Sequence, residues 1–217
     1  MQNGTYIYLL NNEPTGIIET FSIESLPDGT KLTTSTRDAS VYGTTIIVKT
    51  HEKDNKFNEF EINFEKESKI NVIYKFSDKI LYSERTINGK IVDNETINMP
   101  KNCVIFPLMR CFQGQTILQV AKNQSMTPVL VPNIINPTDT MNLLKPTFDK
   151  RTSKKIGTQG IWVSGKSIGL AFDCNIYEYF SKHYNDKSKF WINDNGLLVK
   201  YTFHQSDDKI WTIYLQN

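Results

Sequence analysis

The sequence predicts a mainly β protein, folded as a curved antiparallel sheet or an unclosed β-barrel of about 10–12 strands. Three observations predict this fold class. Short segments in which apolar and polar residues alternate recur along most of the chain. Turn sequences rich in Gly, Asn, Asp and Pro separate them at close intervals, which favours antiparallel neighbours. One stretch, residues 100–120, lacks this alternation, so we expect one or two short helices to cover the open side of the sheet.

The first half of the chain is expected to consist of consecutive strands. In residues 57–64, Phe60, Ile62 and Phe64 face one way while acidic and amide side chains face the other, so one side of this strand should contact water. Asn88 and Gly89 form the strongest hairpin signal, which is typical of a type I′ turn. The strands expected in this half are 5–10, 15–24, 30–37, 42–51, 57–64, 70–76, 80–87 and 90–97.

The central stretch begins with apolar residues, meets Pro107, and then places Arg110 among apolar neighbours. We expect a helix over residues 110–121. The residues from 107 to 147 are the least regular of the chain and form a candidate insertion within a single domain that spans residues 1–217. A helical turn is expected over residues 139–144.

Strands return in the last third of the chain. A turn is expected at Gly165 and Lys166, and another at Asn195 and Gly196, where glycine accepts a positive φ. The strands expected after the central stretch are 126–131, 148–155, 160–164, 167–180, 189–193, 197–205 and 209–216.

Composition narrows the class of function. The 217 residues are 39% hydrophobic and 22% charged, as in an ordinary globular protein. The 25 basic and 23 acidic residues nearly balance, which argues against nucleic acid as a partner. No apolar run approaches the roughly 20 residues of a membrane helix, so no integral membrane segment is expected. Three cysteines without a CxxC pair and the lack of a secretory signal pattern predict reduced thiols and a cytoplasmic location. A monomer or homodimer is expected.

Arg110 is the strongest single candidate for function. A guanidinium in an apolar stretch needs a carboxylate, backbone carbonyls or a ligand anion, because burying it without a partner is costly. One interpretation is an internal salt bridge, with Asp93, Glu95 or Asp173 as the partner. The other is contact with the head group of a ligand, in which Gln113 would assist.

Other reactive side chains are scattered. Cys111 follows Arg110 and is either a buried small side chain or a nucleophile that the guanidinium activates. The histidines at 51, 183 and 204 lack the spacing of metal ligands, and the carboxylates, Asp186 included, form no catalytic pair. No phosphate loop, nucleophile elbow or calcium loop occurs, so neither a metal nor a cofactor is expected. If the protein is an enzyme, the catalytic candidates are Asp173, Glu178 and His204.

Aromatic residues sit mostly on the expected strands. They are either core residues of a sandwich or the wall of a cavity, since a curved sheet with many strands often encloses more space than its side chains fill. Those expected to line such a wall are Tyr42, Tyr74, Trp162, Tyr177, Trp191 and Tyr201.

Three stretches carry a resemblance to a known family. A plug with an arginine, PLMRCFQGQTILQV, interrupts consecutive strands, and the chain closes with KFWINDNGLLVKYTFHQ and KIWTIYLQ. This order of parts resembles the lipoprotein-carrier superfamily. The resemblance implies an unclosed β-barrel that wraps a hydrophobic cavity covered by short helices.

Two functions follow as hypotheses. In the first, the protein binds a hydrophobic small molecule or lipid in the concave cavity of the sheet, with Arg110 and Gln113 at the head group. In the alternative, it is a cofactor-independent enzyme, such as a cyclase, isomerase or hydratase, that acts on an apolar metabolite in the same cavity.

Overall fold

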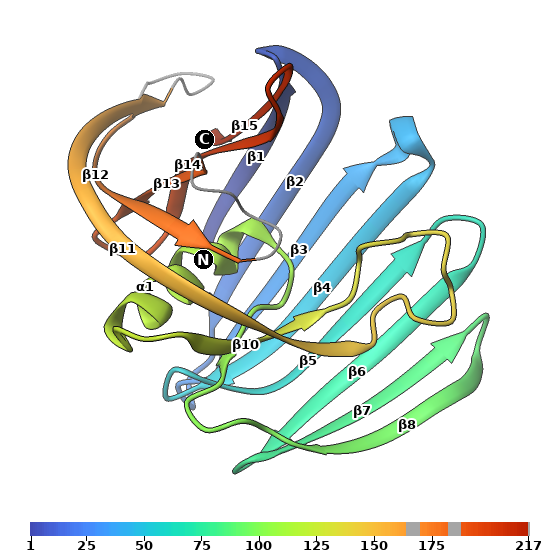
Figure 1. The fold of residues 1–217 in the computed structure, drawn as a ribbon. Helices are drawn as coiled ribbons and strands as arrows, with labels where there is room; N and C mark the ends of the chain where they lie inside the picture. Colours follow the sequence, from blue (N-terminus) through green and yellow to red (C-terminus); the bar gives the residue numbers. More distant parts are fainter. Residues whose placement is uncertain (164–169, 182–187, 217) are drawn as a thin grey trace.

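The computed structural model describes residues 1–163, 170–181 and 188–216 (Figure 1). The turn expected at Gly165 and Lys166 lies outside the described residues, as do His183 and Asp186. In the described part, fifteen strands form one sheet, in the order β8-β7-β6-β5-β4-β3-β2-β1-β15-β14-β13-β12-β11-β10-β9. The first half is the expected meander, and β1 pairs with β15, so the two ends of the chain lie side by side.

The strands follow the alternation in the sequence closely. Their bounds are β1 Gln2–Leu10, β2 Glu13–Ser25, β3 Lys31–Ala39, β4 Thr44–Lys53, β5 Lys56–Glu65, β6 Lys69–Ser77, β7 Ile80–Ile87, β8 Lys90–Asn98, β9 Val104–Ile105, β10 Thr127–Pro132, β11 Pro146–Val163, β12 Leu170–Phe180, β13 Lys189–Asn193, β14 Leu198–Ser206 and β15 Lys209–Gln216. Neighbours are antiparallel except β9 and β10, which are parallel.

The predicted class, a mainly β protein whose sheet does not close, is confirmed. The sheet has fifteen strands rather than about 10–12. The two expected strands 148–155 and 160–164 are one strand, β11, which continues through a register shift between Lys155 and Gly157. Strand β9 has two residues and is too short to show alternation. In Figure 1, β11–β15 curl around a helix, while β2–β8 continue as a broad twisted wing.

The helix is α1, Arg110–Lys122, and it begins at the expected residue. Its buried residues lie on most sides, which is typical of a helix inside a protein rather than on its surface. It packs against β9, β11 and β14. Gly114 permits this approach, because a Cβ there would lie 2.3 Å from the carbonyl oxygen of Gly196. The described residues hold one further helical segment, the 3₁₀ turn η1, Ser40–Tyr42.

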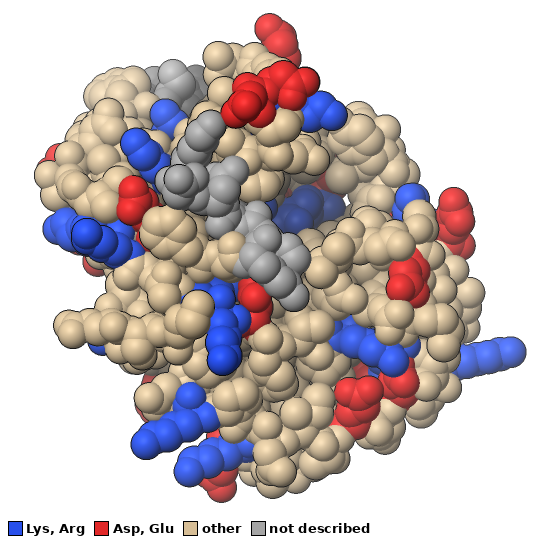
Figure 2. All heavy atoms as spheres, viewed as in Figure 1, with Lys and Arg blue, Asp and Glu red and all other residues tan. Residues whose placement is uncertain are grey.

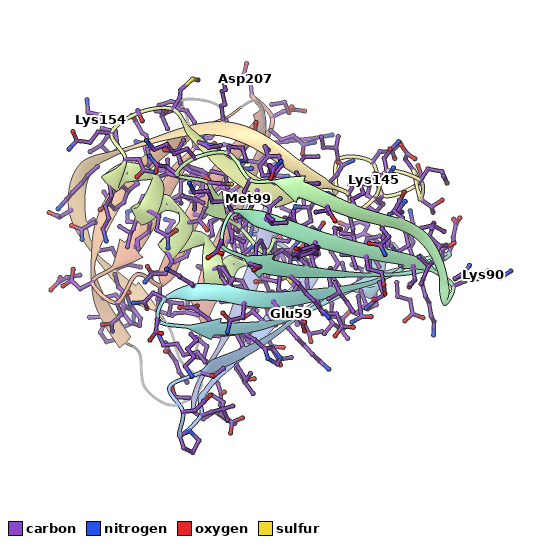
Figure 3. All side chains as sticks on the ribbon, turned by 90° about the horizontal axis from the view of Figure 1, so that it is seen from below. Glu59, Lys90, Met99, Lys145, Lys154 and Asp207 are labelled. Atoms are coloured by element: carbon purple, nitrogen blue, oxygen red, sulfur yellow. The ribbon has the colours of Figure 1, made fainter. Side chains whose placement is uncertain are left out.

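The loop 133–145 joins β10 to β11 and crosses the wing of the sheet. The guanidinium of Arg85 on β7 donates to the carbonyl oxygens of Thr140 (2.7 Å) and Met141 (2.8 Å). The hydroxyl of Tyr74 on β6 donates to the carbonyl oxygen of Leu144. In Figure 3, Lys145 at the end of this loop accordingly lies over the wing whose far hairpin carries Lys90. The helical turn expected at 139–144 is present as hydrogen-bonded turns.

Candidate functional site

The concave face holds a cavity of about 590 Å³ beside the first residue of α1. Figure 2 shows a hollow on one side of the molecule with Lys or Arg atoms inside it. The described residues that line the cavity come from both halves of the sheet, the start of α1 and the residues that follow β10; they are Tyr8, Ile17, Arg37, Phe106, Leu108, Arg110, Val131, Pro132, Asn133, Ile134, Ile135, Thr147, Asp149, Arg151, Tyr201, Phe203, Gln205, Trp211 and Ile213. Most of them are apolar or aromatic, and three are arginines.

Glu19 is the centre of a buried polar network beside this cavity. It lies on β2 and its side chain is 0% exposed. One carboxylate oxygen accepts hydrogen bonds from Arg37 Nε (2.9 Å), Arg37 Nη2 (2.8 Å) and the Tyr8 hydroxyl (2.8 Å). The other accepts from the backbone N–H of Arg110 (2.5 Å). A buried carboxylate is tolerated only when it is paired and hydrogen-bonded in this way.

The register of the sheet places these groups together. Glu19 shares its strand face with Ile17 and Phe21, and this face points inward. Glu19 lies directly opposite Arg37 on β3. A carboxylate at an apolar position of one strand thus meets a guanidinium at the matching position of the next.

The same carboxylate holds the start of the helix. Met109, the residue before α1, supplies no side-chain hydrogen bond to the first turn. Glu19 supplies that acceptor from β2, and a negative charge there is favourable to the helix dipole. The preceding Leu108 has a φ of 64°, a conformation that is costly for leucine, and its carbonyl oxygen accepts a hydrogen bond from Arg37 (3.1 Å). The strained turn is therefore fixed to the same network.

Arg110 projects from the helix start along the cavity wall. Its Nε donates to the Tyr8 hydroxyl (3.3 Å), and its Nη1 donates to Gln113 Oε1. Its guanidinium carbon lies 5.1 Å from the centre of the Tyr201 ring and 5.9 Å from that of Tyr8, within the range of cation–π attraction. Of the three suggested salt-bridge partners, Asp93 is hydrogen-bonded to Arg85 instead.

Arg151 on β11 supplies a third guanidinium from the opposite wall. Its Nε donates to Asp149 (3.1 Å) and its Nη1 to the Tyr179 hydroxyl (2.8 Å). Its guanidinium carbon lies 5.9 Å from the centre of the Phe106 ring. Guanidiniums therefore reach this cavity from β3, α1 and β11.

Burial changes the proton affinity of neighbouring groups. It raises the pKa of Tyr8 to about 12, although the guanidinium of Arg37 acts in the opposite direction. Burial also raises the pKa of the Cys111 thiol well above its usual value. The thiol form is favoured, so a reactive thiolate at Cys111 is not supported by its surroundings.

A second cavity, of about 660 Å³, lies on another side of α1. Cys111, Phe112 and Gln115 line it from the helix, whereas Arg110 lines the first cavity. The described linings share no residue. The helix thus contributes Arg110 to one cavity and its following residues to the other.

The structure brings together three of the predicted ligand-binding residues, Arg110, Gln113 and Tyr201. Arg110 and Tyr201 line the first cavity, whereas Gln113 is buried and is not among its lining residues. The other predicted wall residues lie elsewhere. Tyr74 is fully buried and bonded to the loop, outside the described cavity linings. Tyr177 lies beside the last turns of α1, where it lines a separate depression.

Three wall predictions are corrected by exposure or by strand face. Tyr42 is 58% exposed because it lies in η1 rather than within a strand. Trp162 is 70% exposed on β11. Trp191 alternates with Phe190 and Ile192 of the main core, so it faces a small separate cluster that includes Cys174.

The catalytic candidates are not gathered at either cavity. Asp173 is exposed. Glu178 and His204 are half-buried. None of the three lines the first or the second cavity. The three residues therefore do not meet at the first or the second cavity, and the enzymatic alternative stays a hypothesis.

Sequence reasoning missed Glu19, Arg37, Arg151 and Tyr8 as site residues. A signal was present for Glu19, since the face Ile17, Glu19, Phe21 is apolar except at its centre. A charge at an inward position of an alternating strand is expensive unless it is paired. That rule marks a buried charge, although it does not say which partner it meets.

Comparison with known proteins identifies the fold alone. No protein-family model matches the chain, and no curated protein matches it. Among solved structures, a beta-barrel-like protein of the domain of unknown function DUF1849 from Brucella abortus is similar, with a TM-score of 0.55 and 11% sequence identity. The match covers 98% of this chain and 94% of that chain. It supports the unclosed β-barrel architecture.

Among the residues that the structure describes, no three His, Cys, Asp or Glu side chains gather into a group suited to a metal ion. Within the same residues, no helix is long and apolar enough to cross a membrane.

Proposed function

We propose that this protein binds a hydrophobic small molecule or lipid in the first cavity. The observation that carries the proposal is a cavity of about 590 Å³ on the concave face, with mainly apolar walls and a few polar groups near α1. Ligand sites of this size are typically apolar pockets with a few well-placed polar groups that orient the ligand. The resemblance to the lipoprotein-carrier superfamily adds to this proposal a cavity for an apolar ligand and no role in lipoprotein transport.

Location and assembly belong to the same proposal. All three cysteines, Cys103, Cys111 and Cys174, are free, which is what a reducing compartment such as the cytoplasm favours. We propose a cytoplasmic monomer or homodimer whose partner is the small molecule itself.

The test uses two adjacent residues on β2 that face opposite sides of the sheet. Ile17 lines the cavity, whereas Ile18 is exposed. Ile17→Trp fills part of the cavity, and Ile18→Trp adds the same side chain outside it. Binding of Nile red, an uncharged apolar dye, is measured by fluorescence titration for the wild type and both variants.

We expect wild-type protein and Ile18→Trp to bind the dye with equal affinity. Ile17→Trp should bind it at least about tenfold more weakly. Circular dichroism melting checks that both variants fold. Equal binding by both variants, or no binding by the wild type, would overturn the proposal.

A further inference from the structure

We infer that the ligand of the first cavity carries an anionic head group, a carboxylate or a phosphate, that the arginines of α1, β3 and β11 hold. This inference rests on the proposed function and adds the chemical class of the ligand. The two anions share the chemistry that a guanidinium recognises, namely oxygen atoms arranged to accept two parallel hydrogen bonds.

The composition of the wall is the first argument. Among the described residues that line the cavity, three are arginines and one, Asp149, is a carboxylate. The cavity wall contains no described lysine, so every basic group on it is a planar guanidinium. Arginine is the residue that most often fixes carboxylate and phosphate groups bidentately. Arg37 and Arg151 each pair with a carboxylate of the chain, and Arg110 brings a third guanidinium to the same cavity.

Proximity of like charges is the second argument. Arg37 and Arg110 both lie over the ring of Tyr8, at 5.7 and 5.9 Å from its centre. Two cations near one ring repel each other, and a nearby anion relieves that repulsion. Glu19 provides this relief for Arg37 from within the sheet. Arg110 presents its guanidinium at the cavity, where its contacts include the oxygen atoms of Tyr8 and Gln113, and a ligand anion would add to these contacts.

The gradient of polarity along the cavity is the third argument. Its arginine end adjoins the first residue of α1, where the positive end of the helix dipole adds to the attraction for an anion. The rest of the lining is mainly apolar and includes Ile135, which is 67% exposed, and the half-buried Trp211. The polar side chains of Asn133 and Gln205 lie beside these two residues. An amphiphile would therefore lie with its anion at α1 and its chain toward Ile135 and Trp211.

The test compares ligands that share one chain and differ only in the head group. Hexadecanoic acid, hexadecyl phosphate, hexadecanol and hexadecylamine each displace bound Nile red at neutral pH, below their critical micelle concentrations. We expect at least one of the two anions to bind about tenfold or more tightly than the alcohol, and the amine to bind most weakly. The ratio of the affinities for hexadecanoic acid and hexadecyl phosphate shows which anion the site prefers.

Variants of Arg110 and Lys90 test whether Arg110 causes the preference for an anionic head group. Arg110→Gln should abolish it, so that acid and alcohol bind within about twofold of each other, while Nile red still binds. Lys90→Gln removes the same charge from an exposed hairpin and should leave the preference intact. Should Arg110→Gln fail to fold, Arg110→Lys keeps the charge but loses the bidentate geometry, and a reduced preference is then expected.

The outcomes separate the two proposals. If no probe binds, the proposed function fails. If all four probes bind with equal affinity, the cavity binds apolar chains and the anionic head group is overturned. An unchanged preference in a folded Arg110→Gln protein would also overturn it.

Discussion

Two buried arginine clusters in this protein differ in what surrounds the guanidinium. Arg85 on β7 is 1% exposed, and its partners are Asp93 and the backbone carbonyls of loop 133–145. Arg110 lines a cavity, and its partners include the hydroxyl of Tyr8 and the amide oxygen of Gln113. Arg85 lies among polar neighbours of an alternating strand and fastens a loop, whereas Arg110 lies in an apolar stretch of sequence and borders a cavity.

The difference separates an arginine that stabilises the fold from one that is placed to contact a ligand. Arg85 satisfies its donors with groups of the chain itself and joins two distant segments. Arg110 belongs to a network whose charged centre, Glu19, is fully enclosed while the guanidinium lies at the cavity surface. We therefore expect substitutions around Glu19 and Arg85 to change stability, and substitution of Arg110 to change binding.

The largest effect is expected for Glu19→Gln. The change removes the charge that neutralises Arg37, and breaking a buried ion pair costs about 4 kcal/mol of folding free energy. Urea unfolding followed by fluorescence measures the loss. Glu59→Gln is the matched control, because its ion pair with Lys75 is exposed, and it should change stability by about 0.5 kcal/mol or less. Similar effects for both variants would contradict the central role given to Glu19.

Arg85→Met should lower the unfolding free energy by about 3 kcal/mol, somewhat less than Glu19→Gln because the partner Asp93 remains partly exposed. The released carbonyl groups should make loop 133–145 exchange its amide hydrogens faster. Hydrogen exchange followed by mass spectrometry measures this. Nile red binding to the first cavity should persist in the folded fraction. Unchanged protection of the loop would show that Arg85 does not fasten it.

Alkaline pH gives the smallest of these effects. A tyrosine has an unperturbed pKa of about 10, and burial raises the pKa of Tyr8 to about 12. The folded state therefore binds this proton more tightly than the unfolded state. The stabilisation is present below pH 10 and is lost as the pH rises toward 12, by about 2 kcal/mol.

Tyr8→Phe removes that contribution. Its unfolding free energy should fall less steeply than that of the wild type between pH 10 and pH 12. Urea unfolding at several pH values measures the two slopes. Tyr42→Phe is the control, because this tyrosine is exposed, and its slope should equal that of the wild type. Equal slopes for all three proteins would show that folding does not raise the pKa of Tyr8.

Much of the fold could be predicted from the sequence, because it depends on local chemistry. Alternation located most strands, and Asn88 with Gly89 located a hairpin that the structure contains. The helix start at Arg110 was also predicted, since the apolar stretch around it has no strand period. The two strands predicted at 148–155 and 160–164 proved to be one, because a bulge can carry a strand through an irregular residue.

The site was predictable only in part. Arg110, Gln113 and Tyr201 were singled out and lie together, whereas Tyr42, Trp162 and Trp191 were assigned to a wall that they do not join. By itself, the sequence determined the fold class and the presence of one costly arginine in the central stretch. The tertiary structure decided that Glu19, Arg37 and Tyr8 meet the start of the helix. These contacts join residues up to 102 positions apart, and strand register sets them rather than any local pattern.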